Sequence, residues 1–138
     1  MFNKILVPLD GSEVAEKILE EVKKMASLTE AEVDLLRVAR ATGVFPGTDP
    51  TDKEVAAVEK AEKYLEYIKE KLAQEGLNAS VHVRYGHPAS EILDHAEKVD
   101  LVAMSTHGRT GLDRWALGSV AEKVVRHSKT PVLLVRAA

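Results

Sequence analysis

One segment, Met-Ser-Thr-His-Gly-Arg-Thr-Gly, has the residue types best suited to bind a ligand, and it directly follows a short apolar run. Its glycines, Gly108 and Gly111, permit positive φ angles and let the backbone approach a bound group closely. About ten residues after Gly108, Gly118 and Ser119 open a predicted helix. The first N–H groups of a helix attract anions because they lack partners and lie at the positive end of the macrodipole. Together with Arg109, this segment predicts a phosphate-binding site.

For two candidate residues, a structural role explains the sequence at least as well as a role in ligand binding. Ser119 and Glu122 have the spacing of a capping box, so Ser119 is expected to be the N-cap of the last helix. Asp10, which follows an apolar run, fits a ligand contact, a helix cap and an Asx turn equally well.

No metal site is predicted. His107 has no partner at ligand spacing and is expected to be a polar loop residue, while His82 and His95 are expected to be exposed on a strand and a helix. The chain has no cysteine, which excludes disulfides, thiolate zinc sites, iron–sulfur clusters and a cysteine nucleophile.

Several catalytic and nucleotide-binding signatures do not occur in the sequence. The P-loop pattern, the G-x-G-x-x-G dinucleotide pattern and the G-x-S-x-G nucleophile elbow are all absent. A receiver domain is excluded because no second suitable aspartate or late-strand lysine follows an apolar run. No carboxylate pair, and no histidine with a nucleophile, stands out as acid–base machinery. The predicted site can therefore hold a phosphate but shows no means of cleaving one, and no catalytic residue is assigned.

Composition predicts one globular domain over residues 1–138. The chain has 45% hydrophobic and 30% charged residues and a formal net charge of −3, which argues against nucleic-acid binding. Residues 105–138 carry +4 and the remainder −7, a distribution that suits a small anion better than a polyanion. On charge alone, solvated helix faces explain this distribution better than a binding site does. We find no secretory signal and no apolar stretch long enough for a membrane span, so a cytoplasmic protein is expected.

Strand and helix patterns alternate along the whole chain. Apolar runs or alternation predict strands at Ile5–Val7, Val33–Val38, Val81–Tyr85, Leu101–Met104 and Val132–Val135. Helical periodicity predicts helices at 12–28, 52–75, 88–98 and from Ser119 onward, and residues 40–52 form a loop long enough to be a lid or an interface element. This order predicts an α/β fold, an open parallel five-stranded sheet with helices on both faces. In such sheets ligands bind at the carboxyl ends of the strands.

The motifs, taken together, resemble those of the universal stress protein family over essentially the whole chain. The resemblance is carried by Lys4–Ser12, Gly86–Pro88, Met104–Lys123 and Lys129–Arg136. The family's ATP signature is Gly, two residues, Gly, nine residues, Gly and Ser or Thr. Gly108, the nine residues that follow it, Gly118 and Ser119 match this signature, whereas its first glycine is replaced by Ser105.

The resemblance implies a fold, a ligand and a set of site residues. The fold is a three-layer, Rossmann-like sheet of order 3-2-1-4-5. The ligand is ATP, with Mg²⁺ as its optional counter-ion. Gly108, Gly118 and Ser119 would surround the phosphates beside Arg109, and Asp10 would contact the nucleoside. The remaining contacts implied are Pro8, Leu9, Val38, Met104, Ser105 and Val120.

Ser105 is the one departure from the signature. If its φ angle is negative, a serine costs little there and its hydroxyl can contribute to binding. If its φ angle is positive, the serine costs about 1 kcal/mol or more and the loop must shift.

The resemblance also implies a homodimer, and the sequence gives a reason of its own. The last predicted strand, Val132–Val135, is wholly apolar, and such an edge is usually hidden by pairing with another strand. The function expected first is a small ATP-binding regulatory protein that acts through nucleotide-dependent conformation or an unidentified protein partner in a stress response. The alternatives are a slow ATPase or a nucleotidyl or phosphoryl transferase, and an interaction module of the same fold that binds no nucleotide.

Overall fold

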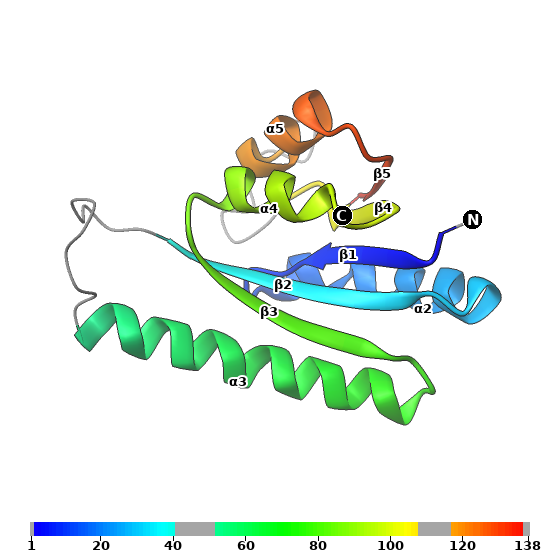
Figure 1. The fold of residues 1–138 in the computed structure, drawn as a ribbon, viewed down its shortest axis with the longest axis horizontal. Helices are drawn as coiled ribbons and strands as arrows, with labels where there is room; N and C mark the ends of the chain where they lie inside the picture. Colours follow the sequence, from blue (N-terminus) through cyan, green and yellow to red (C-terminus); the bar gives the residue numbers. More distant parts are fainter. Residues whose placement is uncertain (1, 41–51, 108–116, 137–138) are drawn as a thin grey trace.

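The computed structural model describes residues 2–40, 52–107 and 117–136, and strands and helices alternate along the described chain (Figure 1). The strands are β1 (Lys4–Pro8), β2 (Glu32–Arg40), β3 (Ala79–Gly86), β4 (Leu101–Ser105) and β5 (Val132–Val135). The helices are α1 (Glu13–Glu16), α2 (Ile18–Thr29), α3 (Asp52–Gln74), α4 (Pro88–Ala96) and α5 (Ser119–His127).

The five strands form one parallel sheet in the order β3-β2-β1-β4-β5, which confirms the predicted fold class and strand order. The chain first builds outward from β1 to β3 and then returns to the other side of β1 with β4. The strand order therefore reverses between β1 and β4. The carboxyl ends of these two strands are where a ligand is expected in a sheet of this kind.

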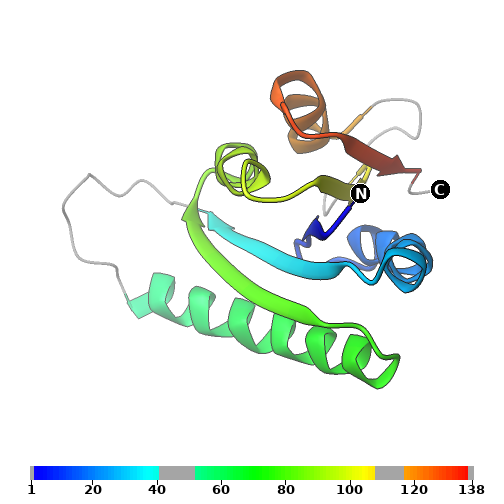
Figure 2. The same ribbon diagram turned by 45° about the vertical axis from the view of Figure 1, so that its right-hand side comes forward.

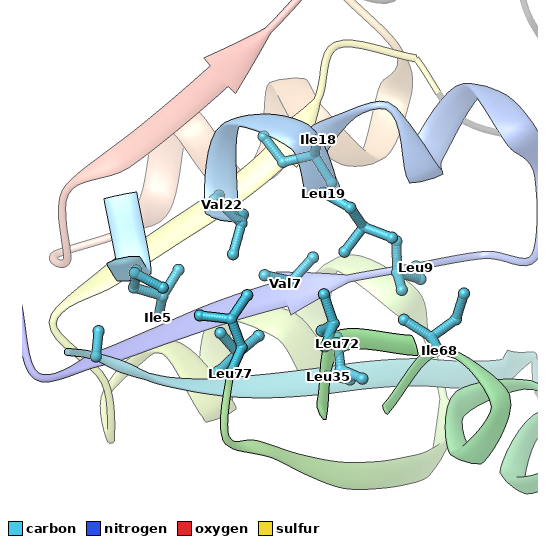
Figure 3. Close-up of a cluster of buried hydrophobic side chains, with 14 of the residues drawn as sticks. Ile5, Val7, Leu9, Ile18, Leu19, Val22, Leu35, Ile68, Leu72 and Leu77 are labelled. Atoms are coloured by element: carbon cyan, nitrogen blue, oxygen red, sulfur yellow. The ribbon is translucent and has the colours of Figure 1, made fainter. Parts of the chain in front are cut away.

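Two hydrophobic clusters lie on opposite faces of the sheet because side chains of each strand alternate between the faces. On one face, side chains of α2 and α3 gather around Val7 and Leu35 (Figure 3). On the other face, α4 and α5 cover Leu6, Leu36 and Val102, and Figure 2 shows these two helices side by side. Both layers of helices are thus present, as predicted.

The ends of the helices follow local signals in the sequence. The Ser12 hydroxyl caps α1 by accepting a hydrogen bond from the Ala15 N–H, as Ser12 was expected to do. The predicted helix 12–28 is two helices, because the Lys17 N–H donates to the Val14 carbonyl three residues back and tightens the chain there. Gly76, with φ +83°, follows the end of α3.

The contact between β1 and β4 is the shortest in the sheet. Only Ile5↔Leu101 and Leu6↔Val102 are paired across it, whereas β1 and β2 share five pairs. At its amino end the Asp100 carboxylate accepts the backbone N–H groups of Asn3 and Lys4, each at 2.9 Å. We call this β1–β4 contact the seam.

The seam opens toward the carboxyl ends of its strands. After Leu6, β1 stays with β2, since the Leu9 N–H donates to the Leu36 carbonyl at 2.8 Å. After Val102, β4 stays with β5, since the Thr106 N–H donates to the Val135 carbonyl at 3.0 Å. The two strand ends therefore part at the point where the topology predicts a ligand.

Two sequence expectations concern other parts of the chain. Nearly all of the loop at 40–52 lies outside the described residues, so its role as a lid or interface element stays a prediction. None of the helices in the described part of the chain is long and apolar enough to span a bilayer.

Candidate functional site

The end of β1 forms a tight turn into α1. The Asp10 carboxylate accepts hydrogen bonds from the backbone N–H of Ser12 at 2.9 Å and from its hydroxyl at 2.6 Å. Gly11, between them, has φ +88°, a conformation that glycine adopts without strain. This is the Asx turn that was one interpretation of Asp10, and it fixes the half-buried carboxylate at the open end of the seam. Leu9 beside it is buried, and Pro8 is half-buried.

Ser105 ends β4 in an ordinary extended conformation. Among the described residues, Glu30 is the only non-glycine residue with a positive φ angle, so the serine carries no backbone strain. Its hydroxyl donates to the carbonyls of Val14 at 2.9 Å and Ala15 at 3.3 Å, and the residue is 6% exposed. The hydroxyl thus ties β4 to α1, and a contact between Ser105 and a ligand stays a prediction.

Gly118 is the N-cap of α5, which corrects the prediction that Ser119 would cap this helix. Ser119 is instead the first helical residue, and the N-cap residue, a glycine, has no side chain with which to cap the helix. The Gly118 N–H donates to the Thr106 carbonyl at 2.8 Å. A Cβ at this position would lie 3.1 Å from that carbonyl oxygen and 3.5 Å from the Cα of His107. The φ angle of Gly118 is −62°, which any residue can adopt, so the backbone angle does not require a glycine. The close approach to the end of β4 is what favours glycine at this position.

Four of the predicted contacts lie on one face of the sheet. The hydrophobic cluster under α4 and α5 includes Met104, and Val38 and Val120 pack against it. Pro8 points to the same face because it is two residues after Leu6 on β1. These residues form an apolar wall near the open end of the seam.

A pocket of about 240 Å³ lies between the amino ends of α4 and α5. Two cationic side chains, Arg40 from the end of β2 and Lys123 from α5, line it together with Ser119 and Val120. The complete lining is Arg40, His87, Pro88, Ala89, Ser90, Ser119, Val120 and Lys123. Helix amino ends and two cations favour an anionic ligand here.

Of this lining, only Ser119 and Val120 were predicted from the sequence as site residues. Arg40 and Ser90 were missed because they are far from the glycine signature in the sequence. The signal that could have found them is strand register: Arg40 pairs with Gly86, so the end of β2 lies beside the turn that starts α4. Gly108 and Arg109 lie outside the described residues, and their roles remain predictions.

The three histidines differ from their expected settings. His107 is 7% exposed, with its Nδ1 3.1 Å from the Thr106 hydroxyl, so it is a buried residue of the β4–α5 connection. His95, expected to be exposed, is 3% exposed, and its Nε2 lies 3.0 Å from the Asp34 carboxylate. His82 is also partly buried, and this burial lowers its pKa, so its ring is neutral near pH 7.

Comparison with known proteins settles the family. Residues 1–136 match the universal stress protein family. The chain belongs to the universal stress protein family. Universal stress protein YxiE of Bacillus subtilis is 38% identical, with 99% of this chain and 100% of the relative covered. The solved structure of MJ0577, a universal stress protein of Methanocaldococcus jannaschii, is 35% identical with a TM-score of 0.79, covering 98% of this chain and 96% of that one.

Some universal stress proteins of this fold have been solved with adenine nucleotides. One is a complex with cAMP, 22% identical to this chain with a TM-score of 0.64, covering 99% of this chain and 98% of that one. Another, from Archaeoglobus fulgidus, is a complex with dAMP, 18% identical with a TM-score of 0.70, covering 97% of each chain. At these identities the two structures show only that the fold is shared with this chain.

Proposed function

We propose that this chain binds ATP at the open end of the seam and acts as a regulatory universal stress protein through nucleotide-dependent conformation or partner binding. The observation that carries the proposal is the amino end of α5, where the N-cap Gly118 supplies no side chain and holds the helix against the end of β4. Gly118 and Ser119 are also the last two members of the family's ATP signature.

The surroundings of the α5 amino end suit the parts of a nucleotide. The apolar wall of Pro8, Val38, Met104 and Val120 offers a surface for a base. The first N–H groups of α5, with Lys123 and Arg40 nearby, offer donors and positive charge for phosphates. Asp10 stands at the end of β1, where it can meet a ribose. Gly108 joins the set through the signature, and Arg109, which follows it, adds a positive charge.

The test is to purify the protein without added nucleotide, denature it and separate the supernatant by anion-exchange chromatography. We expect near-stoichiometric ATP, which would also show that hydrolysis is slow. ADP or AMP alone would support a nucleotide site but contradict the preference for ATP. A site that remains empty after incubation with millimolar ATP, with and without Mg²⁺, would overturn the proposal and favour the interaction module.

The proposal includes a homodimer formed through antiparallel pairing of β5 with its copy. β5 is an edge strand, with all four of its side chains only half-buried. The carbonyls of Pro131 and Val135 face β4, so by alternation the N–H groups of Val132 and Leu134 face the open edge. That edge offers an apolar, hydrogen-bonding surface that self-pairing would cover.

Sedimentation equilibrium at micromolar concentration is expected to give twice the chain mass of 15.1 kDa. Leu134→Pro removes an outward N–H group and is expected to give a monomer, because proline is tolerated on an edge strand where its nitrogen faces outward. Leu134→Ala, which keeps the N–H group, is the control and should remain dimeric. A monomeric wild-type protein would contradict the predicted interface.

A further inference from the structure

Three potential metal ligands meet on the α4/α5 face of the sheet, away from the pocket. Asp34 comes from β2, His82 from β3 and His95 from the last turn of α4. Asp34 is six residues before Arg40 on β2, so these two residues are about 20 Å apart along the strand. The side chains of Asp34 and His95 are 7% and 4% exposed, and that of His82 is 34% exposed.

Only some of the polar atoms in this cluster have hydrogen-bond partners among the described residues. His95 Nε2 lies 3.0 Å from Asp34 Oδ2, at hydrogen-bond distance. His82 Nε2 lies 3.8 Å from Asp34 Oδ1, which is too far for a hydrogen bond. This nitrogen is buried and has no hydrogen-bond partner among the described residues, although it points at a carboxylate. The two imidazole rings meet edge to face, with their centroids 4.6 Å apart.

We propose that Asp34, His82 and His95 form a binding site for a divalent transition-metal ion, for which Zn²⁺ is the best match. Two imidazole nitrogens and one carboxylate oxygen are a donor set that zinc accepts, and three protein ligands leave a fourth position for water. An ion at the centre would use the unpartnered His82 nitrogen and would balance the charge of the buried Asp34 carboxylate.

The distances in the cluster fit such an ion with little movement. Zinc bonds of about 2.0–2.2 Å at tetrahedral angles place two donor atoms about 3.3 Å apart. One ligand atom from each residue lies within 4.8 Å of the other two. The two oxygens of Asp34 lie 3.0 Å from His95 Nε2 (Oδ2) and 3.8 Å from His82 Nε2 (Oδ1), on either side of the separation expected for zinc ligands. The remaining adjustment falls on His82, whose partly exposed ring can turn without moving the buried pair. β3 is an edge strand, so an ion can enter from the His82 side.

The site does not depend on nucleotide binding, and its test is made without nucleotide so that phosphates cannot chelate the metal. Chelator-stripped protein is titrated with Zn²⁺ in competition with a chromophoric chelator. We expect one Zn²⁺ per chain and an affinity at least about tenfold lower for His82→Gln. His82 is the residue to change because it is the least buried ligand, so the variant is expected to fold. His127→Gln, which removes an exposed histidine of α5, is the matched control and should bind Zn²⁺ like the wild type.

A second measurement reports on the ligands themselves. Co²⁺ in place of Zn²⁺ should give the intense visible absorption of a tetrahedral site in the wild type and in His127→Gln, and this absorption should be lost in His82→Gln. Equal Zn²⁺ affinity of wild type and His82→Gln, no stoichiometric Zn²⁺ binding, or a weak octahedral Co²⁺ spectrum would each overturn the proposed site.

Discussion

Replacing Gly118 by aspartate is expected to lower the affinity for ATP by at least about 100-fold, or about 2.8 kcal/mol. The new carboxylate would stand at the N-cap of α5, where an aspartate accepts hydrogen bonds from the first N–H groups of a helix. Those are the donors that the proposed phosphate site uses, and the carboxylate would also repel the phosphates. Aspartate is a favoured N-cap residue, so the cap offsets part of the steric cost of a Cβ 3.1 Å from the Thr106 carbonyl. Loss of binding is therefore expected without loss of the fold.

Gly118→Asn is the matched control for this variant. Asparagine has nearly the same shape and also caps helices, but it carries no charge. Isothermal titration with ATP should rank the affinities as wild type, then Gly118→Asn, then Gly118→Asp, with circular dichroism confirming that all three fold. An unchanged affinity of Gly118→Asp would show that nucleotide, if bound, does not use the α5 amino end. Equal losses for the two variants would assign the effect to the shape and capping of the new side chain and not to its charge.

The largest expected effect on stability comes from Leu65 of α3. Leu65→Ala is expected to lower the free energy of unfolding by about 3 kcal/mol, because truncating a fully buried leucine loses apolar contacts and leaves a cavity. For a chain of this size that loss corresponds to a decrease in Tm of about 10 °C. Leu65 is fully buried in the cluster beneath α3, where it helps to hold this long helix on β2 and β3.

Leu28→Ala is the control, since it makes the same chemical change in a residue that is 86% exposed. We expect its free energy of unfolding to stay within about 0.5 kcal/mol of the wild type. Chemical denaturation of both variants, followed by far-UV circular dichroism, measures the difference. Similar losses for Leu65 and Leu28 would contradict the described packing of α3.

The fold was largely predictable because its signals are local. Unbroken apolar runs such as Ile5–Val7 and Leu101–Met104 indicate strands buried on both faces, and the helices between them set the parallel direction. Punctuating residues such as Ser12 and Gly76 marked where helices begin and end. The strand order did not follow from these patterns and came from the family resemblance.

The details of the site were less predictable because they depend on contacts distant in sequence. His95 has the spacing of an exposed helical residue, but its partner Asp34 is 61 residues away on another element. Ser105 likewise uses its hydroxyl on the carbonyl of Val14, 91 residues away. At the start of α5 the capping-box pattern favoured Ser119. The hydrogen bond from Gly118 to Thr106, which no local pattern encodes, places the N-cap one residue earlier.

The short seam has a consequence for how the molecule comes apart. Only two residue pairs and the hydrogen bonds to the Asp100 carboxylate join β1 to β4. The sheet therefore divides into a β3-β2-β1 part and a β4-β5 part. Partial opening should begin at this boundary, as two cooperative units with separate hydrogen-exchange behaviour. A ligand that contacts Asp10 on one side and Gly118 on the other would link the two units and stabilise the contact between them. The clearest sign of such binding would then be slower amide exchange in β1 and β4 together.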